Sequence, residues 1–477
     1  MRPGFVMAEQ DVIELEIEDA STTPLLRDEE GRLSAEWIEE LRQHIADGES
    51  DEIKKLFADL HASDTGDVLE AITFDERKAL VAALGDNFDY SALTEVDESV
   101  RMELMDFLPN ADIARGMVEL DSDDAVYILE DLNAPDLDEI LAHMPAFERM
   151  SLKRSLDFPE ESAGRRMQTD FIAIPPFWSV GQTIDYMRAD EDLPDEFYQI
   201  YVVDPGYNLL GILPLDRMLR AKRATKIETI MNTTVFQIEA TEDQEEAAHL
   251  FQRYDLVEVA VVDESSRLVG VLTVDDIVDV IHEEADEDFR ALAGVGDEEI
   301  SDSVFEAVKS RITWLLVNLA TAVLASLVIG LFDATIERMV ALAVLMPIVA
   351  SMGGNAGTQT MTVTVRALSM RELDQFNMRR LINRETMVGL VNGLVFAVIT
   401  GIVSAIWFAN IALGGVIAAA MVVNMFAAGI SGILIPLGLN KVGIDPAVAS
   451  SAFVTTVTDV VGFFAFLGFA AIWFGLL

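Results

Sequence analysis

Five long apolar segments in the last third of this 477-residue sequence limit the folds open to the chain. A helix that crosses a bilayer needs roughly 20 consecutive, mostly apolar residues. Segments of this kind lie at about 312–332, 338–366, 387–408, 415–439 and 446–476. Helices satisfy their own backbone hydrogen bonds in lipid, so we predict an α-helical transmembrane domain of five helices over residues 312–477.

Almost all of the net charge lies before these segments. From Ile312 onward seven acidic residues are balanced by seven basic ones, so the formal net charge of −49 belongs to residues 1–311. Such a surface disfavours nucleic acid and attracts cations. The solvated surface of a halophilic protein is an equal explanation of the bulk charge, and it leaves a specific cation role open for a few acids. The sequence has no cysteine, which excludes disulfides and thiolate metal sites.

Basic residues predict the orientation of the spans. They precede the first span (Lys309, Arg311), fill the loop between the second and third (five arginines from Arg366 to Arg384) and separate the last two (Lys441). Positive loops stay on the cytoplasmic side. We therefore expect the acidic half in the cytoplasm and the C-terminus outside the cell membrane. The first residues have no apolar signal-peptide core, so we expect no cleaved leader.

Three polar features interrupt the apolar spans. Asp459 is the only charged residue after Asp445, and a carboxylate at mid-bilayer costs at least about 2.5–3.5 kcal/mol, so it should face water or the bundle interior. The segment SMGGNAGTQT, residues 351–360, predicts a broken or closely packed helix. Asn424 is compatible with pore lining or with hydrogen-bonded packing. A helix–helix contact to Asn or Thr is the alternative role for Asp459.

Several enzyme and pump classes are excluded. None of the five histidines lies in an HExxH motif, which excludes an intramembrane zinc protease of that type. The sequence has no GxxxxGK[ST] loop, so nothing supports ATP-driven pumping by that route.

Two segments of the soluble half are repeats of each other. YVVDPGYNLLGILPLDRML, from Tyr201, matches AVVDESSRLVGVLTVDDIV, from Ala260, and each unit predicts strand, helix, strand, turn, strand and helix. This pattern resembles a tandem CBS pair, a regulatory module that often binds adenine nucleotides. Before it, polar starts alternate with apolar helical faces, which predicts a stack of short helices.

The second repeat ends in an acidic helix, TVDDIVDVIHEEADEDF, at residues 273–289. Asp276, Asp279 and Glu283 share one face at helical spacing. Carboxylates this close repel one another unless a cation lies between them, and a solvated helix face is the alternative. The amphipathic segment that follows, EEISDSVFEAVKSRITW, leads directly into the first span and can carry movement to the membrane.

The whole arrangement resembles the MgtE family of magnesium channels and transporters. The motifs that carry the resemblance are PIVASMGGNAGTQT, RALSMREL, GIDPAVASSAFVTTVTDVVG and VDDIVDVI. The resemblance implies a homodimer with spans two and five around a pore, an aspartate in span five that binds Mg²⁺, closure by intracellular Mg²⁺, and no enzymatic activity. That aspartate corresponds to Asp459.

The resemblance also implies specific site residues. The predicted pore-lining residues are Gly353, Gly354, Asn355, Gly357, Thr360 and Asn424. The predicted cytoplasmic Mg²⁺ ligands are Asp123, Asp243, Glu245, Asp255, Asp276, Asp279, Glu284, Glu287, Asp288 and Asp445. Two acidic family positions are His282 and Tyr127 here, which leaves the number of regulatory ions open.

These inferences predict a multi-domain protein with six parts. They are an acidic tail (1–30), an all-α helical-repeat N domain (31–165), CBS repeats of α+β type (166–230 and 231–288), a connecting helix region (289–311) and the transmembrane domain (312–477). Two alternatives are open: transport of Co²⁺, Mn²⁺ or another divalent cation, and a membrane sensor of the CBS type that conducts nothing.

Overall fold

The structure, a computed structural model, describes residues 25–28, 30–189, 193–194, 197–296, 304–371, 373 and 375–475. They form two compact units, Met1–Lys153 and Arg154–Leu477. Nearly all of the predicted acidic tail at 1–30, and part of the predicted connecting region at 289–311, lie outside the described residues.

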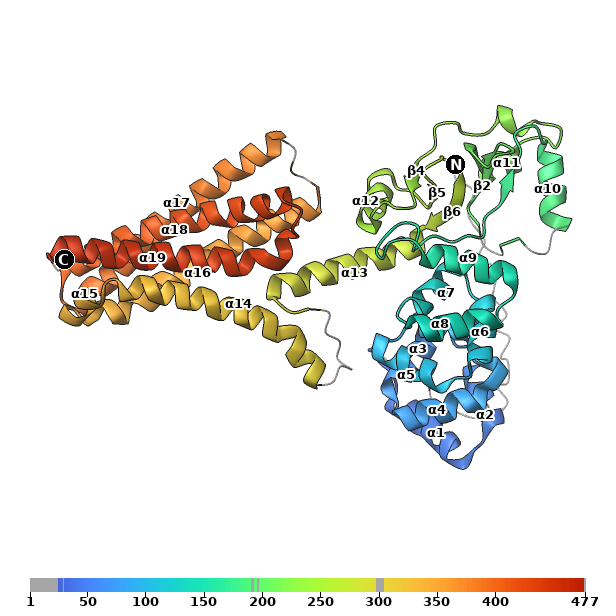
Figure 1. Cartoon of the computed structure of the whole chain (residues 1–477), viewed down its shortest axis with the longest axis horizontal. Coiled ribbons are helices and arrows are strands. Elements are labelled where there is room, and N and C mark those ends of the chain that lie inside the picture. Colours follow the sequence, from blue (N-terminus) through green and yellow to red (C-terminus); the bar gives the residue numbers. More distant parts are fainter. Residues whose placement is uncertain are drawn as a thin grey trace, which may run out of the picture. The chain divides into compact units, whose positions relative to one another are not determined.

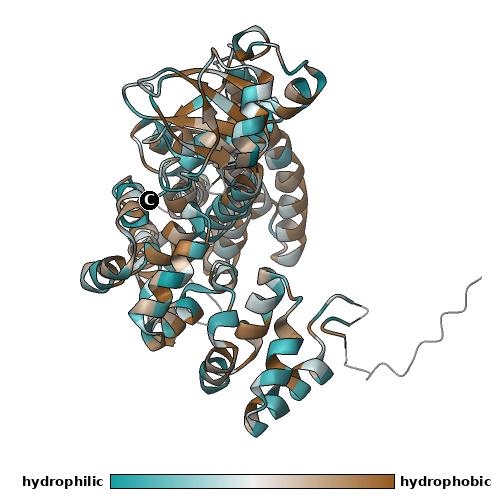
Figure 2. Ribbon diagram, turned by 90° about the vertical axis from the view of Figure 1, so that its right-hand side faces the viewer, coloured by the Kyte–Doolittle hydropathy of each residue, from teal (hydrophilic) through white to brown (hydrophobic). Residues whose placement is uncertain are grey.

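The first unit is built of short helices, as predicted. They are α1 (Ala35–Asp47), α2 (Ser50–Phe57), α3 (Ala62–Ala71), α4 (Phe74–Leu84), α5 (Glu98–Phe107), α6 (Asn110–Glu119), α7 (Ser122–Leu129), α8 (Ala134–His143) and α9 (Ala146–Leu156), whose last turn enters the second unit. Polar residues at the N-termini begin several of these helices. At α4, the Glu76 carboxylate accepts a hydrogen bond from the Thr73 backbone N–H at 2.8 Å, which closes a capping box. Figure 2 shows hydrophilic and hydrophobic residues alternating along these helices, and their apolar residues form the core of this unit.

The second unit begins with two copies of one βαββα module, which confirms the predicted CBS pair. The first comprises β1 (Ala173–Ile174), α10 (Val180–Ala189), β2 (Gln199–Val203), β3 (Leu209–Pro214) and α11 (Leu215–Arg220), and the second β4 (Gln237–Glu239), α12 (Gln244–Tyr254), β5 (Glu258–Val262), β6 (Leu268–Thr273) and α13 (Val274–Ala293). In each, the first two strands are parallel and the last two antiparallel, with a register shift at Val202/Val203 and at Val261/Val262. Each copy of the repeated sequence therefore folds into its own sheet, and the two sheets have the same topology.

A buried polar contact joins the two repeats. The Tyr201 hydroxyl, fully buried on β2, donates to Glu258 Oε1 on β5 at 2.6 Å. The Tyr198 backbone N–H donates to the other carboxylate oxygen at 3.2 Å. Burial raises the pKa of Glu258 above its usual range, although both hydrogen bonds act against this. A hydrogen-bonded carboxylate is thus held at the joint of the CBS pair.

We expect the Glu258→Gln variant to lose a pH dependence of stability that the native chain has. A carboxyl whose pKa is raised on folding favours the folded state below its unfolded pKa, and this contribution is lost as pH rises through the folded pKa. The melting temperature of the native protein should therefore fall relative to that of the variant between pH 4 and pH 8. Thermal unfolding of both full-length proteins in detergent measures the difference, and parallel curves would contradict the expectation.

In the part of the chain that the structure describes, five helices are long and apolar enough to cross a membrane, which confirms the predicted transmembrane domain. They are α14 (Val304–Gly330), α16 (Ala341–Ser369), α17 (Gln375–Trp407), α18 (Ile411–Lys441) and α19 (Pro446–Phe474), with the short α15 (Asp333–Arg338) after the first. Figure 1 shows α16 to α19 lying side by side, and α18 packs against α16, α17 and α19.

Two details differ from the expectations. The end of the predicted connecting region, residues 304–311, belongs to the same helix as span one, because α14 begins at Val304 and continues without a break into the apolar segment. The second span is also unbroken: α16 runs through Pro347 and the glycine segment for 29 residues. Of the two alternatives for SMGGNAGTQT, the structure has the closely packed helix. Small residues let neighbouring helices approach at this depth without exposing backbone to lipid.

Candidate functional site

The glycine segment of α16 packs into the bundle. A Cβ at Gly353 would collide with the side-chain amide of Asn424 on α18, and a Cβ at Gly357 would lie 2.5 Å from Val454 Cγ1 on α19. Thr360 is buried as well. Four of the six predicted pore-lining residues, Gly353, Gly357, Thr360 and Asn424, are therefore buried in helix contacts in this structure, which gives them a packing role.

Asn424 holds two helices together at the same level. It is fully buried, and its Nδ2 donates to the backbone carbonyl oxygen of Val349 at 2.8 Å. Its other neighbour is Gly462 on α19, where an added Cβ would lie 2.7 Å from the same amide. Of the two roles open to Asn424, the structure has the hydrogen-bonded packing contact.

We expect Gly353→Ala to destabilise the membrane domain and Gly354→Ala to leave it intact. The first methyl group meets Asn424, whereas the second has only Thr455 Cγ2 at 4.0 Å. Overpacking costs about 1–3 kcal/mol. Adjacent glycines of one helix thus provide a matched pair, and thermal unfolding in detergent compares them. Equal melting temperatures would contradict this packing.

A stripe of polar side chains faces out of the bundle on α16. Ser351, Asn355, Gln359 and Thr362 are exposed and spaced by three or four residues, which places them on one face of the helix. Polar groups at membrane depth seldom face lipid, because hydrocarbon offers them no hydrogen bonds. This stripe therefore indicates a water-filled path or a second copy of the chain.

Asp459 lies on a matching stripe of α19. Ser451, Thr455 and Asp459 are half-buried and four residues apart, and Thr455 adjoins Gly354 of α16. Among the residues that the structure describes, the Asp459 carboxylate has no hydrogen bond or ion pair. This excludes the alternative contact to Asn or Thr for this structure. The two stripes border each other and form one polar surface, which we call the α16–α19 polar surface.

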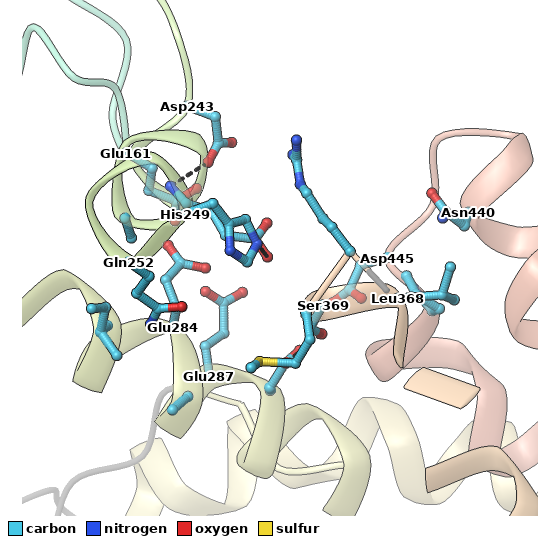
Figure 3. A pocket seen from close by; sticks show the side chains of 18 residues that line it. Glu161, Asp243, His249, Gln252, Glu284, Glu287, Leu368, Ser369, Asn440 and Asp445 are labelled. Carbon is cyan, nitrogen blue, oxygen red and sulfur yellow. Dashed lines mark hydrogen bonds and ion pairs between the residues drawn. The ribbon is translucent and has the colours of Figure 1, made fainter. Parts of the chain in front are cut away.

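Acidic side chains surround a cavity of about 560 Å³ where α12 and α13 meet the end of α16 and the start of α19. Figure 3 shows the labelled side chains around this space. They come from α12 and α13, the ends of α16 and α18, the residues that precede α12 and α19, and Glu161 in the segment before β1. Six of the predicted Mg²⁺ ligands line it: Asp243, Glu245, Glu284, Glu287, Asp288 and Asp445. We call it the acidic cavity.

Helix starts and hydrogen bonds position these carboxylates. Asp243 precedes α12 and accepts from the Glu245 backbone N–H at 2.8 Å, and Asp445 precedes α19 and accepts from the Ala447 N–H at 2.8 Å. The Ser369 hydroxyl of α16 donates to Asp288 at 2.7 Å. Three elements distant in sequence therefore hold their acids at one place.

Burial raises the pKa values of three of these acids. The pKa of Glu284 is raised by burial against its hydrogen bond from Gln244, and burial also raises the pKa of Asp288. The pKa of Glu245 is raised by burial and by the nearby acids Asp243 and Asp288, while Arg371 opposes the shift. Carboxylates that repel one another in this way favour a bound cation.

The ligand chemistry fits Mg²⁺, which takes oxygen ligands and keeps several of its waters. In the described part of the chain no three acids or histidines converge closely enough to hold an ion by direct contact. The carboxylates surround the cavity rather than meet at a point, an arrangement that suits a hydrated ion. Ligation here would rest on Glu284, Glu287 and Asp288 of α13 across from Asp445.

Three other predicted ligands belong to the second unit but do not line the acidic cavity. Asp255 ends α12 with a left-handed φ of 52°, and Asp276 accepts from the Thr273 hydroxyl at the start of α13. Asp279 lies on α13, where partial desolvation of its carboxyl raises its pKa. Asp123 belongs to the first unit, where it is buried on α7.

The structure also explains part of the acidic helix and its departures from the family pattern. Glu283 is paired with Arg166 at 2.5 Å, so it is neutralised within the chain. Tyr127 packs its ring on the Arg101 guanidinium at 4.5 Å, a contact that an acid could not make. His282 is exposed on α13.

Sequence reasoning missed three residues. Glu161 and Arg371 line the acidic cavity, and Arg371 forms an ion pair with Glu246 of α12. Glu385 of α17 is buried, with Arg384 Nη2 at 2.7 Å and the Thr360 hydroxyl at 3.4 Å. The one sequence feature that could have pointed to Glu385 is its position at the start of an apolar span.

Five long apolar helices with a polar surface around one carboxylate, joined to a CBS pair and an acidic cavity, define an integral membrane protein of the cation-transporter class. Family models agree: one described as "divalent cation transporter" matches residues 346–469, the MgtE intracellular N domain matches 60–161, and the CBS domain matches 227–283.

Relatives extend the match along the chain. The magnesium transporter MgtE of Enterococcus faecalis is 35% identical over 324 residues, 68% of this chain and 72% of that protein. The protein of the same name from Bacillus subtilis is 29% identical over 427 residues, 89% of this chain and 95% of that protein. The chain belongs to the MgtE family, which confirms the resemblance seen in the sequence.

Solved structures with similarity to the chain include two of soluble parts. One, the cytosolic domain of the Mg²⁺ channel MgtE in complex with ATP, covers 51% of this chain and 99% of that chain, with 25% identity and a TM-score of 0.48. The soluble part of a magnesium transporter covers 52% of this chain and 98% of that chain, with 26% identity and a TM-score of 0.46.

Proposed function

We propose that this chain forms a homodimeric, Mg²⁺-selective path for magnesium uptake across the cell membrane, closed by intracellular Mg²⁺. The observation that carries the proposal is the α16–α19 polar surface, which leads to an unpaired carboxylate inside an apolar bundle. The magnesium transporters to which the chain is similar supply the identity of the cargo.

A two-fold dimer explains why one acid per chain is enough. A second copy facing the α16–α19 polar surface brings a second Asp459 opposite the first, since a two-fold interface repeats the same patch. Two carboxylates balance one dication, and Asn355 and Gln359 on the same surface supply polar groups for its water shell. Sparse charge also lets the ion leave, which conduction requires.

The acidic cavity supports closure by Mg²⁺. Beside it, Ala291 of α13 packs with Met361 and Val365 of α16 and with Ala447 and Val454 of α19. Helix α13 therefore touches both helices of the polar surface at their cytoplasmic ends. An ion in the cavity draws the acids of α12 and α13 toward Asp445 and tightens this contact. Without the ion, repulsion between the same acids loosens it, so the ion shifts a two-state equilibrium.

Three further parts of the proposal follow from the sequence. The loop arginines support an orientation with the CBS pair in the cytoplasm and the C-terminus outside. The CBS pair is proposed to bind an adenine nucleotide, which isothermal titration of the purified protein with ATP tests. Asp123, Asp255, Asp276 and Asp279 are proposed to hold further regulatory ions.

Mg²⁺ influx into liposomes that contain the purified protein tests the function. Influx above that of empty liposomes is expected, with no influx if the chain is a sensor that conducts nothing. Oxygen ligands do not distinguish Mg²⁺ from Mn²⁺ or Co²⁺, and the matching family model is described for divalent cations in general. Competition by Mn²⁺ and Co²⁺ in the same liposomes decides between the cargoes, and influx of those ions without Mg²⁺ would overturn the selectivity.

A further inference from the structure

Helix α17 is much longer than a bilayer requires. Its 33 residues extend about 50 Å at 1.5 Å per residue, whereas the hydrocarbon core is about 30 Å thick. The apolar part, from Met387 to Trp407, already covers about 30 Å. The first three turns, which include Phe376 and the arginines, therefore project beyond the hydrocarbon.

One stripe of α17 faces away from the bundle along its whole length. In the apolar part this stripe contains Met387, Val391, Leu394, Val398 and Ile402, all at least half exposed and spaced by three or four residues. In an integral membrane protein such a face contacts lipid chains.

The same stripe continues into the projecting turns with different chemistry. At the same spacing it contains Arg384, Arg380 and Phe376, and Arg379 adjoins it. Phe376 is 86% exposed. The arginines thus continue the lipid-facing stripe toward the N-terminus of α17. Along the helix axis, Arg384 lies about 4.5 Å and Arg380 about 10 Å from Met387. This is the depth of phospholipid headgroups.

Two of these arginines are not neutralised by an acid of the described chain. Arg384 is 61% exposed and pairs with Glu385. Arg379 and Arg380 are exposed, and neither has a hydrogen bond or ion pair to any residue in the described ranges. A guanidinium binds phosphate oxygens in a fork, and its stem lies along apolar groups.

We propose that Phe376, Arg379, Arg380 and Arg384 form a binding site for the headgroup of an anionic phospholipid in the adjoining leaflet. The arginines bind the phosphate, and Phe376 enters the interface beside the acyl chains. The site also counteracts the repulsion between an anionic membrane and the acidic soluble half, and so holds this end of α17 at the surface. It rests on the proposed membrane placement but not on ion transport.

Native mass spectrometry of the full-length protein, titrated with phosphatidylglycerol or phosphatidylcholine, tests the site. The Arg379→Gln/Arg380→Gln variant should bind phosphatidylglycerol about 30-fold more weakly, because each arginine near an anionic surface contributes a factor of about five. Its phosphatidylcholine binding should not change. The Arg379→Lys/Arg380→Lys variant keeps the charge without the fork and should lie in between.

The matched control is Arg217→Gln/Arg220→Gln, which removes two exposed arginines of α11 in the soluble CBS repeat. It should bind phosphatidylglycerol as the native protein does. Equal loss in both variants, or none in the α17 variant, overturns the proposal. A changed oligomeric state with unchanged lipid binding also overturns it and identifies the acidic surface of a second copy as the occupant. Mg²⁺ influx, measured separately, reports on the transport proposal alone.

Discussion

Replacing Asp459 with asparagine is expected to reduce Mg²⁺ influx into liposomes by at least roughly 100-fold. The substitution preserves the shape of the side chain and removes its charge. In the described chain this carboxylate has no hydrogen bond or ion pair. A unit charge at 4 Å from an ion contributes about 4 kcal/mol near a protein surface, and a dimer loses two such charges. A fluorescent Mg²⁺ indicator inside the liposomes measures the rate.

Two variants make this result specific. Asp333→Asn removes the same charge from the start of α15, away from the α16–α19 polar surface, and should leave influx unchanged. Asp459→Glu keeps the charge on a longer side chain and should retain part of the influx. Native influx in Asp459→Asn would show that the path does not depend on this carboxylate and would remove the proposed pore site.

Neutralising the acidic cavity is expected to make the protein insensitive to intracellular Mg²⁺. In the triple variant Glu284→Gln/Glu287→Gln/Asp445→Asn, the inhibitory Mg²⁺ concentration should rise at least tenfold. Each carboxylate 4 Å from a unit charge contributes about 1 kcal/mol in a water-like dielectric, and a dication doubles this. The same substitutions also remove the repulsion that loosens the contact of α13 with α16 and α19, so the level of flux without Mg²⁺ can change as well. The decisive readout is therefore the loss of inhibition by Mg²⁺. Patch recordings with Mg²⁺ varied on the cytoplasmic side measure it.

The control for this variant lies on the same helix. Asp286 is exposed on α13 and does not line the acidic cavity, so Asp286→Asn should be inhibited at the native Mg²⁺ concentration. If the triple variant and Asp286→Asn respond alike, general surface charge controls the gate and the cavity is not its sensor.

Much of the architecture could be predicted from local sequence. The five spans follow from runs of apolar residues, because a bilayer selects for hydrophobicity residue by residue. The CBS sheets follow from a repeat whose alternating apolar residues predict the same strands twice. Helix ends were less predictable: the boundary expected at 311 falls inside α14 because polar, amphipathic and apolar turns continue as one helix.

The role of each polar residue in the spans required the fold. Asn424 and Asn355 are both isolated amides in apolar surroundings, yet the first is fully buried against Val349 and the second is exposed on the α16–α19 polar surface. Local composition cannot distinguish these two roles, because they depend on which helix packs against the face that carries each asparagine. Glu385 was missed for the same reason, since its burial depends on α18 and on Thr360.

By itself the sequence determined the membrane domain, the repeated sheets, the uneven charge and the family, because each of these depends on local patterns along the chain. The tertiary structure alone decided which six of the ten predicted cytoplasmic ligands surround one cavity. Those six come from three regions, of which the first and last are 202 residues apart (243 to 445), and side chains so distant in sequence meet only where α12, α13 and α19 pack together.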